Sequence, residues 1–185
     1  MGTVTVTPTE FALVEFDAAR ITGVSEKLLS DIGLDADLTV EVNEASPLAR
    51  IKVESLEPLR VGVDGGSFED PRHPRQLSEA AVADTLGRLL FQVKDRLDPS
   101  FGAPEFGEAI DLPHKVAWDC YATGRLARLG YRSQRQRWLY HFRNRCGFTD
   151  AADGCFEQIW EGSGLSWADL CAMVDEALAA RGAAA

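Results

Sequence analysis

Seven arginines between Cys120 and Thr149 are the residues most able to do chemistry, and this stretch contains no acidic residue. Guanidinium groups stay charged at physiological pH and donate paired hydrogen bonds to carboxylates and phosphates. The chain has a formal net charge of −10, so the remainder carries −17. This asymmetry predicts either internal ion pairs or an anionic partner. The seven are Arg125, Arg128, Arg132, Arg135, Arg137, Arg143 and Arg145.

Aromatic residues alternate with these arginines, a composition that is typical of surfaces that bind nucleic acid or phosphate. On a helical wheel, however, Trp138, Phe142 and Cys146 share one face, which indicates a core-facing side. The arginines of the same helix point in different directions, so they form no continuous basic stripe. The sequence pI of about 4.8 also disfavours binding to a nucleic-acid duplex.

We therefore expect a non-catalytic accessory protein that presents an arginine-rich helical surface to an acidic partner. In a second interpretation, acids of the following helix, such as Asp153 and Glu157, neutralise the arginines internally. In a third, the protein is an enzyme or binding protein for a small phosphate- or carboxylate-bearing ligand, with an arginine clamp and His114, His141 or Tyr121 moving protons. The predicted contact residues are Arg128, Arg132, Arg135, Arg137, Tyr140, His141, Arg143 and Arg145.

Other chemical motifs are weak, so we predict no catalytic residue, metal site or cofactor. His114 and Cys120 are six residues apart, which places them on different faces of a helix, and Cys120 is expected to be a buried structural thiol. His73 has no second ligand at metal spacing. The glycine loops at 64–66 and 162–164 lack the strand-to-helix context of a phosphate-binding loop.

The elements that must position these residues begin with three runs of alternating apolar residues, at 38–42, 48–53 and 59–63. Alternation is typical of half-buried strands, and we predict an antiparallel three-stranded meander. Ser78 can cap a long amphipathic helix that ends before Asp98-Pro99 and covers the apolar face of the sheet. Before the strands, we expect a short helix that begins near Ser25 and ends at Gly33.

A stretch rich in Gly, Pro and Phe, residues 100–111, predicts a connecting loop between an α+β part, residues 1–99, and a helical part, residues 112–181. We expect the two parts to form one compact unit of the α+β class. Capping residues and terminal glycines predict four helices in the second part, at 112–129, 134–146, 150–161 and 167–180, with Ser133 and Gln136 as a capping box for the second.

The order of helix, three strands and long helix resembles that of small zincin-like metallopeptidases. Enzymes of that family carry His-Glu-x-x-His on the helix after the sheet, whereas this chain has Gly87-Arg88-Leu89-Leu90-Phe91. The resemblance covers about half of the chain. It therefore implies a related order of elements without zinc and without peptidase activity.

Composition is ordinary for a folded protein, with 45% hydrophobic and 26% charged residues in a chain of 185. No apolar run is long enough to span a membrane, and the N-terminus lacks the pattern of a secretion signal. Four cysteines without short spacing suit buried thiols in a reducing compartment. We therefore expect a cytoplasmic protein that binds no membrane, and the preference for Arg over Lys suggests a bacterial source.

Overall fold

The computed structural model describes residues 2–183 and confirms the α+β class. Within these residues the chain forms six α-helices, a mixed four-stranded sheet and a two-stranded sheet. Contacts divide the chain into two compact units, Met1–Leu90 and Phe91–Ala185. The division falls inside helix α2 (Glu79–Leu97). No helix in the described residues has the length and apolar character needed to cross a membrane.

The four-stranded sheet belongs to the first unit and has the strand order β1-β2-β4-β3. Strand β2 is parallel to β1 on one side and to β4 on the other, and only β3 and β4 are antiparallel. The strands are β1 (Val4–Thr7), β2 (Leu38–Asn43), β3 (Ile51–Leu56) and β4 (Leu59–Asp64).

The predicted antiparallel meander is therefore wrong, although its three runs are strands. The register places Leu38 beside Leu59 and Val40 beside Val61, so the fully buried rows of β2 and β4 lie next to each other. Strand β3, which has no fully buried residue, takes the edge. Alternation reveals which side of a strand is buried, but it does not reveal which strand is its neighbour.

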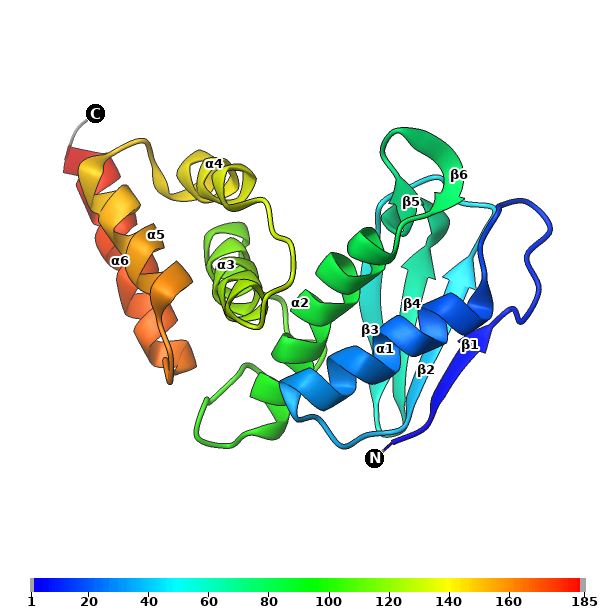
Figure 1. The fold of residues 1–185 in the computed structure, drawn as a ribbon. Helices are drawn as coiled ribbons and strands as arrows, with labels where there is room; N and C mark the ends of the chain where they lie inside the picture. Colours follow the sequence, from blue (N-terminus) through cyan, green and yellow to red (C-terminus); the bar gives the residue numbers. More distant parts are fainter. Residues whose placement is uncertain (1, 184–185) are drawn as a thin grey trace. The chain divides into compact units, whose positions relative to one another are not determined.

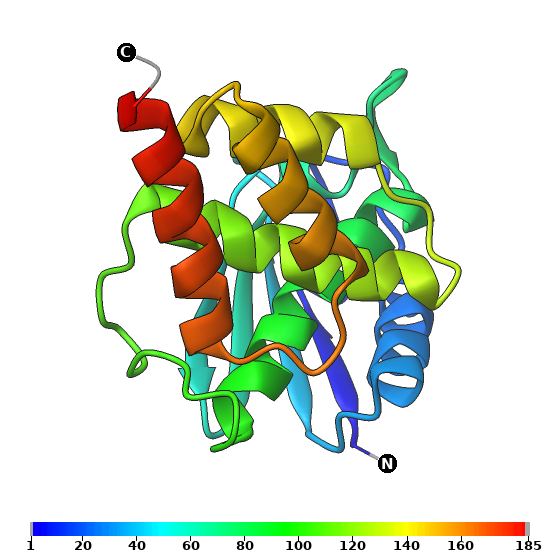
Figure 2. The same cartoon turned by 90° about the vertical axis from the view of Figure 1, so that its left-hand side faces the viewer.

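Helix α1 (Ala18–Ile32) begins earlier than expected, because the side chain of Asp17 accepts hydrogen bonds from the first backbone N–H groups. Ser25 lies in the middle of the helix, where its hydroxyl donates to the carbonyl of Ile21. The helix ends as predicted at Gly33, which has a φ of 69°. Helix α1 and the first turns of α2 lie over one face of the sheet (Figures 1 and 2).

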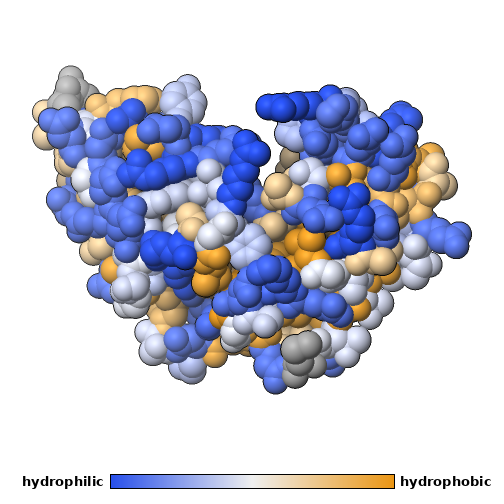
Figure 3. Space-filling view, in the orientation of Figure 1, coloured by the Kyte–Doolittle hydropathy of each residue, from blue (hydrophilic) through white to orange (hydrophobic). Residues whose placement is uncertain are grey.

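A small hairpin precedes α2. After the 3-10 turn η1 (Gly65–Ser67), strands β5 (Glu69–Asp70) and β6 (His73–Leu77) form a two-stranded sheet. Hydrophilic side chains cover this hairpin (Figure 3). As the sequence predicted, Ser78 then caps α2 by accepting a hydrogen bond from the backbone N–H of Ala81.

The second unit contains the end of α2 and the four predicted helices, whose boundaries differ from expectation by a few residues at most. Thr149 caps α5, and Ser166 and Asp169 form the capping box of α6. The proposed box at Ser133 is absent, since no side chain caps α4. The helices are α3 (Leu112–Arg128), α4 (Arg135–Cys146), α5 (Asp150–Glu161) and α6 (Trp167–Ala183).

Candidate interaction surface

Arg125 lies in the interior of the second unit. Its guanidinium donates two hydrogen bonds to Asp95, at 2.7 and 2.6 Å, and the indole N–H of Trp118 donates to the same carboxylate at 2.7 Å. The guanidinium carbon is 4.0 Å from the centre of the Tyr121 ring and 4.5 Å from that of Phe91. Arg125 is therefore a structural residue that joins α2 to α3.

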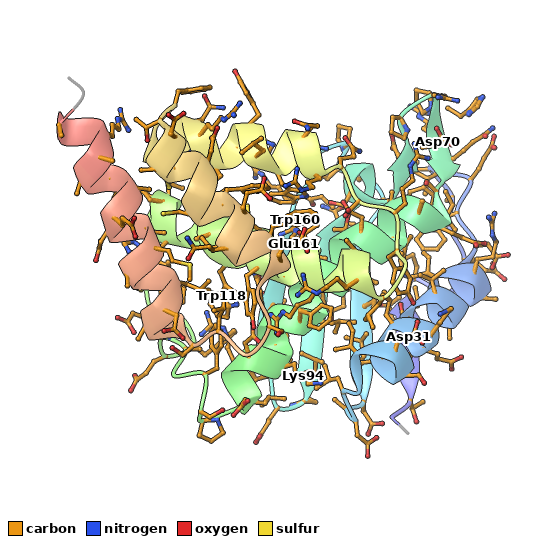
Figure 4. All side chains as sticks on the ribbon, turned by 60° about the vertical axis from the view of Figure 1, so that its left-hand side comes forward. Asp31, Asp70, Lys94, Trp118, Trp160 and Glu161 are labelled. Carbon is orange, nitrogen blue, oxygen red and sulfur yellow. The ribbon has the colours of Figure 1, made fainter. Side chains whose placement is uncertain are left out.

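Three of the predicted contact residues have partners inside the second unit. Arg143 makes a bidentate ion pair with Asp153 at 2.7 and 2.6 Å, and its hydrogen bonds lower the pKa of that carboxyl. Arg135 pairs with Glu157. Arg128 donates to the carbonyls of residues 160 and 162, at the end of α5, where Figure 4 shows Trp160. These contacts agree with internal neutralisation for part of the arginine-rich segment.

Arg132, Arg137 and Arg145 are exposed and form no ion pair with an acidic residue in the described part of the chain. Helical spacing places Arg137, Tyr140 and His141 on the outer side of α4, opposite the buried Phe142 and Cys146. Arg137 donates from Nε to Nε2 of His141 at 3.4 Å. Arg145 lies in the last turn of the same helix.

Two exposed aromatic rings lie beside these cations. Tyr140 is 59% exposed and Phe148 is 65% exposed, and their ring centres are 6.2 Å apart in an edge-to-face arrangement. Arg181 of α6 adds another cation, since its Nη1 donates to the carbonyl of Arg145 at 3.4 Å. We call this surface the α4 patch and define it as Arg137, Tyr140, His141, Arg145, Phe148 and Arg181.

The sequence analysis missed Phe148 and Arg181. Phe148 directly follows Gly147, where α4 ends, so the helical pattern of α4 does not predict which way it faces. Arg181 comes from the far end of the chain. A Cβ atom at Gly147 would lie 3.1 Å from Cβ of Arg181, which shows how closely the two segments approach. Arg132 precedes α4 and lies outside the patch.

A separate hollow of about 290 Å³ lies among α2, α3 and the loop before α6. It contains two of the groups considered for catalysis or anion binding, Tyr121 and Arg125, but neither His114 nor His141. Arg125 is already neutralised by Asp95, and Lys94 and Asp98 line the hollow with opposite charges. The hollow therefore offers little net positive charge to an anion.

His114 and the cysteines also fail to form a nucleophilic pair. His114 contacts Asp111 at 2.6 Å and Asp175 at 3.7 Å, and no sulfur is among its partners in the described residues. Burial raises the pKa of the Cys146 thiol to about 12, so that it stays protonated. Cys120 is fully buried. Within residues 2–183, no three His, Cys, Asp or Glu side chains are placed to hold a metal ion.

Comparison with known proteins gives no family. No protein-family model matches the chain, and no curated protein or solved structure is significantly similar to it. A function has to be argued from the α4 patch itself.

Proposed function

We propose that this chain is a non-catalytic interaction protein and that the α4 patch binds an acidic protein partner. One observation carries the proposal. Arg137 and Arg145 are exposed without an acidic partner in the described residues, next to two exposed aromatic rings, although the chain has a net charge of −10. Arginine with tyrosine or phenylalanine is the composition of interface centres, because these side chains combine large contact area with charge-assisted hydrogen bonds.

An acidic protein segment fits this patch better than a nucleic-acid duplex. A duplex carries one negative charge about every 1.7 Å, and its attraction to a few arginines must overcome repulsion from the rest of an acidic chain. A protein segment with only a few carboxylates can bind the same arginines, and the acidic remainder of this chain repels it much less than it repels a duplex. It can also place an apolar side chain on Tyr140 and Phe148.

The test measures binding of poly-L-glutamate and of an oligothymidylate of similar length by biolayer interferometry at physiological salt. We expect poly-L-glutamate to bind the wild-type chain and to bind at least tenfold more weakly to the Arg137→Glu/Arg145→Glu variant. The Arg50→Glu/Lys52→Glu variant has the same change of net charge on exposed residues of the first unit, and it should bind like wild type. Equal loss in both variants, or tighter binding of the oligothymidylate, would overturn the proposal.

The second candidate function is binding or conversion of a small anion. The observation that favours it is the concave shape of the hollow with Tyr121 and Arg125 in its lining, although the charges of that lining cancel. Thermal denaturation with phosphorylated metabolites and small carboxylates tests this alternative. We expect these anions to shift the melting temperature no more than an inert salt does at the same ionic strength. A shift that disappears in an Arg125→Met variant which remains folded would instead favour the small-anion function.

A further inference from the structure

The loop between α2 and α3 holds an acidic turn in a fixed place. Phe101 is buried, and its carbonyl accepts a hydrogen bond from the backbone N–H of Trp167 at 2.8 Å. Arg96 donates to the carbonyl of Pro104 at 2.5 Å, and its guanidinium carbon lies 4.9 Å from the centre of the Trp118 ring. The base and the middle of the loop are therefore anchored to the core of the second unit.

The turn itself consists of Glu105-Phe106-Gly107-Glu108, closed by a hydrogen bond from the N–H of Glu108 to the carbonyl of Glu105 at 3.0 Å. All four residues are exposed, and Phe106 is 47% exposed. Gly107 has a φ of 91°, a conformation that glycine adopts without strain. The turn thus presents one aromatic ring between two carboxylates, of which that of Glu108 also accepts a hydrogen bond from the backbone N–H of Glu105 at 3.2 Å. Arg96 contacts the ring of Phe106 at 5.9 Å and lies near Glu108, so it offsets part of this negative charge.

This turn is complementary to the α4 patch in chemistry. The patch has an aromatic pair, Tyr140 and Phe148, with arginines around it, and the turn has an aromatic residue with acids on either side. Arg137 and Arg145 are separated by about 12 Å along the helix axis. The two glutamates of the turn are closer together than Arg137 and Arg145. The long side chains of Glu and Arg can bridge this difference. Aromatic contacts and charge-assisted hydrogen bonds would then form together.

Within one chain, no hydrogen bond, ion pair or ring contact joins the Glu105–Glu108 turn to the α4 patch in the described residues. In Figure 2, the loop leaves the lower end of α2 and rises along the side of the unit to the start of α3, while α4 lies at the upper end. A contact between them therefore needs two molecules. It would be heterologous, with the turn of one copy on the patch of the next.

We propose that the acidic partner of the α4 patch is a second copy of this chain, which contributes the Glu105–Glu108 turn. This inference rests on the proposed function, because it assigns the occupant of the same patch. The contact is small, so association is weak and reversible. Net repulsion between two acidic chains weakens it further.

The experiment uses the full chain and a fluorescein-labelled peptide of residues 100–111. Fluorescence anisotropy at physiological salt should show that the peptide binds wild type, binds Arg137→Glu/Arg145→Glu at least tenfold more weakly, and binds Arg50→Glu/Lys52→Glu like wild type. A peptide with Phe106→Ser should also bind at least tenfold more weakly. In analytical ultracentrifugation, the weight-average mass of wild type should rise with concentration.

A charge-swap pair tests the contact directly. Glu105→Arg/Glu108→Arg and Arg137→Glu/Arg145→Glu should each remain monomeric alone. Their mixture should associate, because the unchanged turn of the second variant meets the unchanged patch of the first, and the arginines of the changed turn meet the glutamates of the changed patch. A single chain that carries all four changes should self-associate again. A wild-type chain that stays monomeric near 1 mM and does not bind the peptide would overturn this inference. If poly-L-glutamate still bound the patch, the proposed function would stand with a different partner, and if it did not, both would fail.

Discussion

Arg125 and Arg137 have the same side chain, but their surroundings differ. The side chain of Arg125 is 17% exposed, and Asp95, its partner, is 5% exposed. Charges in such a place are stable only when they are paired, because each has lost its hydration. Arg137 keeps its hydration and has only His141 as a hydrogen-bond partner among the described residues. Arg137 is therefore available to a partner molecule, whereas Arg125 is not.

We predict that Asp95→Ala lowers the free energy of unfolding by about 3–5 kcal/mol, because it leaves a buried guanidinium without a counter-charge and the indole N–H of Trp118 without its acceptor. Urea denaturation followed by circular dichroism measures the change. As a control, Glu41→Ala removes the exposed partner of Arg60 and should cost no more than about 1 kcal/mol. Similar small losses in both variants would contradict the structural role given to Arg125.

At the scale of elements, the approach of α3 to α5 depends on Gly124. A Cβ atom at this position would lie 2.2 Å from the carbonyl oxygen of Trp160, and backbone atoms cannot give way as a flexible side chain can. The same carbonyl accepts a hydrogen bond from Arg128. Close packing of these helices thus places one predicted contact residue, Arg128, against the end of α5.

We predict that Gly124→Ala destabilises the chain by about 1–3 kcal/mol, since α5 must move away from α3. Gly154→Ala is the matched control. Gly154 lies in α5 with nothing within 4 Å of its Cβ position, so alanine should stabilise the helix by about 0.5–1 kcal/mol. Thermal denaturation shows whether each substitution raises or lowers the melting temperature. A neutral or stabilising Gly124→Ala would show that the helices do not approach so closely.

Local signals in the sequence located the helices of the second unit within a few residues, but they placed the start of α1 too late and did not give the pairing of the sheet. Thr149, Ser166 and the terminal Gly147 lie beside the helices that they delimit, so each boundary could be found within a few residues. Strands β2 and β4 pair because their buried side chains lie side by side, although β3 lies between the two strands in the sequence. No local pattern predicts this pairing. Strand β1 has only four residues, Val-Thr-Val-Thr, which is too short for a clear alternation.

The arginine-rich segment could be found from composition, but its division into paired and unpaired members could not. Arg143 and Arg135 reach acids of α5, as one interpretation expected, because α4 and α5 are neighbours in the chain. The partner of Arg125 is Asp95, which lies on α2, thirty residues earlier in the chain, where no local pattern links it to Arg125. Arg181 joins the patch only because α6 returns to the end of α4. These contacts depend on tertiary packing.

At the scale of the whole molecule, the two units differ in charge. Residues 1–90 contain 16 acidic and 8 basic residues, and residues 91–185 contain 13 and 11, so the formal net charges are −8 and −2. The second unit therefore repels an acidic partner less than the first. It is also the unit that carries the α4 patch, which is consistent with the proposed function.

Acid stability tests the charge arrangement of the same unit. Hydrogen bonds lower the pKa of Asp111, chiefly through the backbone N–H of His114, and that of Asp153, chiefly through Arg143. A carboxyl with a lower pKa in the folded state binds protons more readily when unfolded. Its stabilising contribution is complete above the ordinary aspartate pKa of about 3.9. The contribution is lost as the pH falls through the lower pKa that the carboxyl has in the folded state.

We therefore predict that Asp111→Asn/Asp153→Asn has a lower melting temperature than wild type at pH 6, and that the difference shrinks as the pH falls to about 3. The side chain of Asp111 is 62% exposed and that of Asp153 is 37% exposed, so solvent screening keeps the effect small. Glu57→Gln, an exposed change in the turn between β3 and β4, should melt like wild type throughout. A difference between the double variant and wild type that stays constant from pH 6 to 3 would mean that the hydrogen bonds do not favour the charged carboxylates, and that Arg143 is free to take part in binding.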